Sequence, residues 1–183
     1  MWKYIMVLFL IINCSAVSAE IPARSDKIII ILESFQKESW SEKELENVKL
    51  ITDFVQNLMN YHNFDYVLEK YNDDSYIQHN RNLPDGIDGL VGFLQEFVQD
   101  YPDYTYEVKH IYADGDYVTF HSHATLKEKD RGNDRKGMNI IDTWRIENGK
   151  IVEHWDSIQA LDTLLRFNFW MTGGKIRNKN GVF

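Results

Sequence analysis

Histidines and carboxylates on predicted strands are the residues of this sequence that could do chemistry. Asp142 lies in the segment NIIDTWRI, where Ile140 and Trp144 share its face because alternate residues of a strand point to the same side. A carboxylate between two apolar neighbours is unusual. If that face is the inner one, a desolvated carboxylate becomes usable as a general base or acid near neutral pH. The alternative is an exposed aspartate that pairs with a Lys or Arg.

Two further histidines stand near strand ends with polar companions. In the segment IVEHWDSIQ, His154 and Asp156 share one face, and a carboxylate two residues away can orient an imidazole ring. The same pair could equally be a structural bridge at the strand end. His79 is followed by Asn80 and ends a short predicted strand beside a glycine-containing turn, where chain ends line the mouths of cavities.

His121 and His123 form an H-x-H pattern that could contribute to a metal site. Two such histidines can bind one metal, but a third ligand is then needed, which His79 or Asp142 could supply only by folding. The favoured interpretation is polar residues on an exposed or dimer-forming face. The sequence also lacks a phosphate-binding glycine loop, a G-x-S-x-G motif and paired C-x-x-C motifs. We therefore predict no metal site and no cofactor.

The elements that must position these residues change from helices to strands along the chain. Ser41 and Glu44 predict a capping box, after which apolar residues recur at helical spacing. A shorter helix is predicted after Asn63, and a third runs from about Ile87 to Gln99.

In the second half of the chain, apolar and polar residues alternate as they do in β-strands. Hairpins are predicted over residues 104–127 and 137–159, joined by the highly charged segment KEKDRGNDRK. Helices followed by long antiparallel strands predict an α+β domain whose curved sheet wraps around the helices. The apolar run within KIIIILESF could be a short helix or an edge strand, and the pattern leaves both open.

Length and composition limit the classes of partner. A chain of 183 residues with 44% hydrophobic residues suits one domain with its own core. The chain carries 28 acidic against 20 basic residues and a formal net charge of −8. This balance argues against nucleic-acid binding and against docking on anionic lipid, since both need a basic surface.

The N-terminus has the features of a secretory signal peptide. Lys3 precedes an apolar run over residues 5–12, and small residues at 17–19 form a cleavage site after Ala19. The run is too short to span a bilayer comfortably, which disfavours an uncleaved membrane anchor. We expect an exported protein, periplasmic or secreted, with no membrane attachment after cleavage and without Cys14, the only cysteine of the chain.

Three segments together resemble the SnoaL-like proteins of the nuclear transport factor 2-like superfamily, which also includes polyketide cyclases and ketosteroid isomerases. They are YIQHN with the following Asp85-Gly86, the strand pair IDTWRIENGKIVEHWD, and the terminal NKNGVF. The resemblance covers roughly Glu44 to Phe183. It suggests a division into a signal peptide (1–19), a variable extension (20–41) and a SnoaL-like domain (42–183).

The resemblance implies a cone-shaped α+β roll, in which about three helices pack in the mouth of a curved, mostly antiparallel sheet around an apolar pocket. SnoaL-type cyclases close a ring by intramolecular aldol condensation without a metal or cofactor. Asp142 stands at the position of the pocket aspartate, His79 at the cavity mouth, and His154 with Asp156 in the E-H-W-D signature.

From these observations we expect cofactor-free acid–base chemistry on a small carbonyl compound, of aldol-cyclase or isomerase type. Asp142 would be the base, and His79 and His154 would donate hydrogen bonds or relay the proton. The expected ligand pocket is lined by Asn80, Trp144, Trp155 and Asp156.

Two other functions stay open. The cavity could hold a small hydrophobic molecule without catalysis, or the outer face of the sheet could form a homodimer while the pocket is vestigial. A pocket aspartate with a raised pKa and a histidine within hydrogen-bond reach favours the enzyme. A sealed apolar pocket whose polar groups are all paired internally favours the binding protein, and a filled core with a large exposed apolar sheet face favours the interaction domain.

Overall fold

The computed structural model describes residues 28–73, 75–172 and 177–180. The predicted signal peptide and the first part of the predicted extension lie outside the described residues. Within the described residues, no helix is long and apolar enough to cross a membrane.

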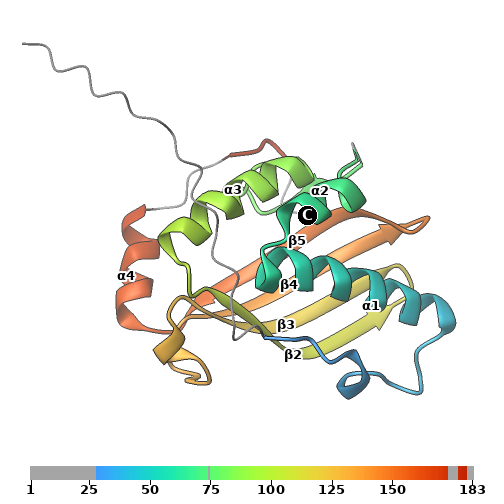
Figure 1. Ribbon diagram of the computed structural model, residues 1–183, viewed down its shortest axis with the longest axis horizontal. Coiled ribbons are helices and arrows are strands. Elements are labelled where there is room, and N and C mark those ends of the chain that lie inside the picture. The colour runs from blue at the N-terminus through green and yellow to red at the C-terminus, as the bar shows by residue number, and fades with distance from the viewer. Residues whose placement is uncertain (1–27, 74, 173–176, 181–183) are drawn as a thin grey trace, which may run out of the picture.

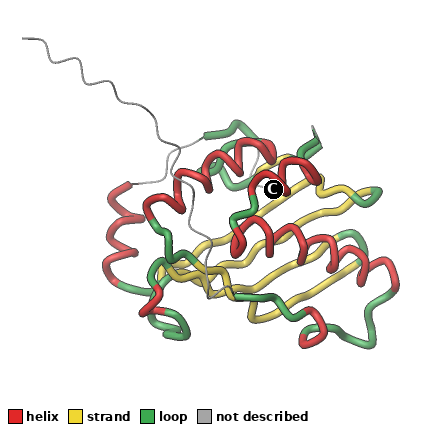
Figure 2. The backbone as a smooth tube through the Cα atoms, in the orientation of Figure 1, coloured by secondary structure: helices red, strands yellow, loops and turns green. Residues whose placement is uncertain are grey.

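Three helices cover one face of a sheet, as Figures 1 and 2 show. They are α1 (Glu42–Val55), α2 (Phe64–Tyr71) and α3 (Gly86–Asp100). The predicted capping box begins α1, because the Ser41 hydroxyl accepts from the Glu44 backbone N–H and the Glu44 carboxylate accepts from the Ser41 N–H. A π-helical segment, η2 (Gln56–Tyr61), continues α1 and ends at His62, which has left-handed backbone geometry. The three helices predicted from apolar spacing are thus confirmed.

The sheet is mixed and open. Its strands are β1 (Ile77–Gln78), β2 (Thr105–Asp114), β3 (Tyr117–Thr125), β4 (Met138–Glu147) and β5 (Lys150–Ala160), in the spatial order β1-β5-β4-β3-β2. Strands β2 to β5 pair antiparallel, which confirms both predicted hairpins, and β1 pairs parallel with β5.

The core lies between the inner face of the sheet and the helices. Strand β4 alternates strictly, with its inner-face side chains buried: Met138, Ile140, Asp142, Trp144 and Ile146. The apolar stripes of the helices, including Ile51, Val67 and Ile87, close over this face. The predicted α+β architecture is confirmed, with Asp142 on the inner face.

Two parts of the fold differ from the sequence expectations or resolve them. A fourth helix, α4 (Thr163–Thr172), follows β5 and was not predicted; Figure 1 shows it at one end of the sheet. The apolar run near residue 30 forms neither a regular helix nor a strand. It leads into a single 3-10 turn, η1 (Leu32–Ser34), and the Ile30 N–H donates to the Gln56 side chain. The charged connection between β3 and β4 holds a second 3-10 turn, η3 (Glu128–Asp130).

Candidate functional site

Asp142 is buried at the centre of the inner face of the sheet, with 3% of its surface exposed. The hydroxyl of Tyr106, from β2, donates to Oδ2 of Asp142. The other oxygen, Oδ1, lies 3.1 Å from Nε2 of His154 on the neighbouring strand β5. Each carboxylate oxygen of Asp142 therefore has a partner that can donate a hydrogen bond to it.

His154 is held between two aromatic rings on the inner face. Its ring lies 5.2 Å from that of Trp144 and 6.4 Å from that of Tyr76, measured between centroids, and both pairs are stacked. The second nitrogen, Nδ1, lies 3.0 Å from Oε1 of Gln78 on β1. The parallel register of β1 and β5 places Gln78 directly beside His154.

The backbone N–H of Asn80 shows which nitrogen of His154 must be protonated. The Asn80 N–H donates to Oε1 of Gln78 at 2.9 Å, and a backbone N–H can only be a donor. Because Gln78 Oε1 is thereby identified as the amide oxygen, Nδ1 of His154 must carry the proton that it donates to this oxygen. The remaining contact, between Nε2 and Asp142 Oδ1, then needs one further proton. Either an imidazolium donates to a carboxylate or a carboxylic acid donates to a neutral imidazole.

Asp156 lies beside this pair on the same side of β5. The Asn80 side-chain N–H group lies 2.7 Å from each of its carboxylate oxygens. Burial raises the pKa of Asp156, the charge of His154 opposes that shift, and the nearby Asp142 adds to it. The site therefore concentrates two carboxylates around one imidazole in a poorly solvated region.

Within the part of the chain that the structure describes, this trio is the only group with the spacing of metal ligands. One ligand atom from each of Asp142, His154 and Asp156 lies within 4.8 Å of the others. Both nitrogens of His154 and both oxygens of Asp142 are already engaged in hydrogen bonds. A metal ion would have to displace these bonds, so the arrangement suits proton transfer better than metal binding.

Three buried tyrosines lie near the site, and one of them, Tyr106, donates a hydrogen bond to Asp142. Burial raises the pKa values of Tyr76, Tyr104 and Tyr106, and the charge of Asp142 raises all three further. Their hydroxyls therefore stay protonated at neutral pH. Tyr106 keeps its proton beside Asp142, where a hydrogen-bond donor is needed.

His79 and Trp155 do not join this group, which corrects the sequence expectation. The His79 ring stacks on that of Trp155 at 4.6 Å, and its Nε2 lies 3.9 Å from the Glu153 carboxylate. Glu153 and Trp155 alternate with His154 along β5, so they face away from Asp142. Gln78, one residue before His79, takes the inward position, and alternation turns His79 outward.

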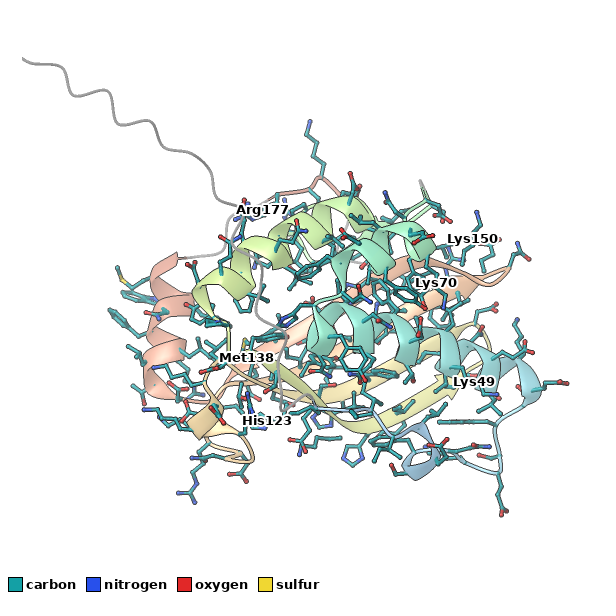
Figure 3. All side chains as sticks on the ribbon, in the orientation of Figure 1. Lys49, Lys70, His123, Met138, Lys150 and Arg177 are labelled. Atoms are coloured by element: carbon teal, nitrogen blue, oxygen red, sulfur yellow. The ribbon has the colours of Figure 1, made fainter. Side chains whose placement is uncertain are left out.

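The other expected residues divide between the site and the outer face. Asn80 and Asp156 are hydrogen-bonded to each other beside His154, and the ring of Trp144 stacks on that of His154. His121 and His123 are used elsewhere: His121 Nε2 lies 2.6 Å from the Asn139 side-chain oxygen, and His123 Nε2 lies 2.7 Å from the Lys136 carbonyl. Figure 3 labels His123 close to Met138 at one end of the sheet, away from α1.

Among the hollows on the surface of the described residues, two are relevant to the predicted cavity around Asp142. The first, of about 310 Å³, is polar and reaches Tyr76, whose ring stacks on that of His154; it is lined by Asn72, Asp73, Tyr76, Asp85, Gly86 and Asp88. The second, of about 490 Å³, lies between α1 and the turn that joins β4 to β5. Neither hollow is lined by Asp142, so the predicted apolar cavity around this residue stays a prediction.

Tyr106 and Gln78 are functional candidates that the sequence analysis missed. Gln78 stands in the same QHN triplet as His79 and Asn80, so its inward side could have been derived from the parity of the strand. Tyr106 carries no such signal, because a tyrosine on an apolar strand face has the pattern of ordinary core packing.

Comparisons with known proteins give a consistent family and fold. Residues 51–154 match the family model described as the SnoaL-like domain. The fold is similar to that of a candidate polyketide cyclase from Bacillus cereus ATCC 10987, with a TM-score of 0.54 and 22% identity over 72% of this chain and 92% of the other. A candidate polyketide cyclase from Acidithiobacillus ferrooxidans gives 0.53 and 14% identity over 76% of this chain and 100% of the other. No curated protein matches the sequence significantly.

Proposed function

We propose, on the premise that this chain belongs to the SnoaL-like domain family, that it catalyses cofactor-free acid–base chemistry on a small carbonyl compound. The reaction would be of aldol-cyclase or isomerase type, with Asp142 as the base. The single observation that carries the proposal is the buried Asp142 carboxylate, held between a tyrosine hydroxyl and an imidazole.

The proposed reaction begins with the ionised form of Asp142. Its carboxylate takes a proton from the carbon next to a carbonyl, and the electron pair of that C–H bond moves to the carbonyl oxygen as an enolate. Tyr106 and His154 are the donors within reach that can hydrogen-bond the enolate oxygen. The enolate carbon then attacks a second carbonyl and forms a C–C bond, or it is reprotonated elsewhere. In both cases the proton returns from Asp142 to the product.

The hollow at Tyr76 is the approach that we propose for the substrate. Tyr76 lines this hollow and also stacks on His154, so one aromatic ring separates the surface from the reacting pair. Its hydroxyl accepts a hydrogen bond from Nε2 of Gln78 at 3.3 Å. A shift of this ring would connect the hollow with Asp142.

Replacement of Asp142 by asparagine tests the proposal, because it removes the basicity and keeps the shape. We expect Asp142→Asn to lower the rate of α-proton exchange into D2O by about a hundredfold or more, in line with the loss of a general base. A panel of small ketones that includes 4-phenylbutan-2-one, followed by NMR, measures the exchange. His79→Ala is the matched control and should keep the parental rate, since His79 lies on the outer face. An unchanged rate in Asp142→Asn would contradict the proposal.

A non-catalytic binding protein for a small hydrophobic ligand is the second candidate. The observation that favours it is the internal pairing of both Asp142 oxygens and both His154 nitrogens. In this case Asp142→Asn should bind a hydrophobic probe, 8-anilinonaphthalene-1-sulfonate, with the affinity of the parent, and neither protein should exchange ketone protons above the buffer rate.

A further inference from the structure

The C-terminal segment 177–180, which we call the C-terminal strap, lies against the loop that follows β1. Its first residue is anchored twice, because the Arg177 N–H donates to the Arg81 carbonyl at 2.8 Å and its guanidinium lies 5.4 Å from the centroid of the Phe93 ring. Figure 3 shows Arg177 beside α3. The strap therefore joins the end of the described chain to residues about a hundred positions earlier.

Two asparagines of the strap bind the backbone of this loop. The side-chain N–H group of Asn178, which is 6% exposed, donates to the carbonyls of Asn80 and Leu83 at 2.9 and 3.0 Å. The side-chain N–H group of Asn180 donates to the Gln78 carbonyl and to Oδ1 of Asp85, both at 2.9 Å. Asp85 Oδ1 in turn accepts from the Gln78 N–H.

Two of the four residues whose backbone carbonyls the strap binds, Gln78 and Asn80, also hold the reacting groups. Gln78 accepts from Nδ1 of His154, and Asn80 supplies both the N–H that orients Gln78 and the side-chain amide that holds Asp156. Each of these contacts is a direct hydrogen bond, whose strength falls steeply with distance and angle. A small shift of the loop therefore breaks it. Among the described residues, the hydrogen bonds of the strap to the rest of the chain go to the segment 78–85 and not to Asp142 or His154. The strap therefore acts on these two residues through the loop.

We propose that Asn178 and Asn180 are positioning residues, which keep Gln78 in place and thereby hold the proton of His154 on Nδ1. The inference rests on the proposed function of the Asp142–His154 pair. It makes this pair depend on a segment outside the matched region 51–154. Without the strap, Gln78 loses its fixed orientation, and Nδ1 of His154 loses the acceptor that holds its proton.

Nitrogen NMR of the histidine rings in the whole protein tests this inference without any substrate. The six histidines are labelled with ¹⁵N, and the His154 signals are assigned by their loss in His154→Asn. In the parent, Nδ1 of His154 should have the shift of a protonated nitrogen. In Asn178→Ala/Asn180→Ala, this signal should move toward the shift of an unprotonated nitrogen, because Nδ1 then lacks the fixed acceptor that holds its proton.

Lys179→Ala is the matched control, because Lys179 stands between the two asparagines and its side chain is exposed. It should leave the His154 signals at their parental positions. Asn180→Ala alone retains both Asn178 contacts and provides a second variant if the double replacement does not fold. A parental His154 spectrum in a folded Asn180→Ala protein would overturn the inference. Loss of ketone exchange plays no part in this readout, so the proposed function can fail while the strap is still tested.

Discussion

At the scale of single residues, a buried carboxylate and a half-buried one lie next to the same imidazole. Asp142 and Asp156 are direct cross-strand partners on β4 and β5. Asp142 has Tyr106 and His154 as hydrogen-bond partners, whereas the side-chain partner of Asp156 is Asn80. Burial raises the pKa of Asp156, and the charge of Asp142 adds to this; the charge of His154 and the hydrogen bond from Asn80 oppose the shift without cancelling it.

Replacement of Asp156 by asparagine should therefore stabilise the protein increasingly as pH rises. Because its pKa is higher in the folded than in the unfolded state, the folded state binds more protons. This contribution to stability is fully present below the unfolded pKa of about 3.9 and is lost as pH rises through the raised folded pKa. Urea unfolding of the parent and Asp156→Asn at several pH values measures the difference. The control is Asp134→Asn, in the exposed charged loop, whose free energy of unfolding should vary with pH as that of the parent does. The same pH dependence for Asp156→Asn and the parent would disprove the expectation.

At the scale of elements, one carboxylate joins α1 to α2. Oδ2 of Asp53 accepts from the hydroxyls of Tyr66 and Tyr71 and from Nζ of Lys70, all three on α2. Burial raises the pKa of Asp53, but the hydrogen bonds from Tyr71, Lys70 and Tyr66 outweigh it and hold the pKa below its usual value. Figure 3 shows Lys70 on α2, above the sheet. This contact fixes the two helices that cover the inner face.

We expect Asp53→Ala to destabilise the protein at pH 7 by about 1 kcal/mol, a value that allows for solvent screening of this partly exposed group. Because the pKa of Asp53 is lowered on folding, its stabilisation is present above the unfolded pKa and is lost as pH falls through the folded pKa. The difference between Asp53→Ala and the parent should thus shrink in acid. Thermal unfolding at pH 7 and in acid measures it, with Glu69→Ala, exposed on α2, as the control. A difference that grows in acid would contradict this assignment.

At the scale of the whole molecule, two surfaces expose large apolar side chains. The outer face of the sheet exposes Tyr117 on β3 and Ile141 on β4, at 46% and 37%. Helix α4 exposes Leu164, Phe167, Trp170 and Met171 on the side away from the core, and the rings of Phe167 and Trp170 lie 5.9 Å apart. Apolar surface of this kind marks interaction sites more often than scattered single residues do.

The predicted homodimer would use the outer face of the sheet. Ile141→Lys places a charge at the centre of that face and should convert a dimer into a monomer in analytical ultracentrifugation. Trp170→Lys, on α4, is the matched replacement at the other apolar surface and should leave the dimer intact. A monomeric parent would refute the prediction, and dissociation by Trp170→Lys alone would move the interface to α4.

The sequence by itself determined the elements and the side on which their residues point. The capping box at Ser41 set the start of α1, and the alternation along β4 placed Asp142 on one face with Ile140 and Trp144. The same alternation put His154 and Asp156 together on β5. These properties depend on residues within a few positions of each other, because the helical and strand periods are local. They were sufficient for the α+β class and for three members of the site, Asp142, His154 and Asp156.

Only the tertiary structure decided what these residues contact. Gln78 and His154 are 76 residues apart, and Tyr106 is 36 residues from Asp142, so no local period relates them. The register between β1 and β5 brought Gln78 rather than His79 to His154, since a shift of one residue exchanges the faces of a strand. The strap adds hydrogen bonds to the same loop between residues that are 95 to 102 positions apart in the sequence. Such contacts form only when the sheet and helices have packed, which is why the sequence could suggest Asp142 and His154 but not the residues that orient them.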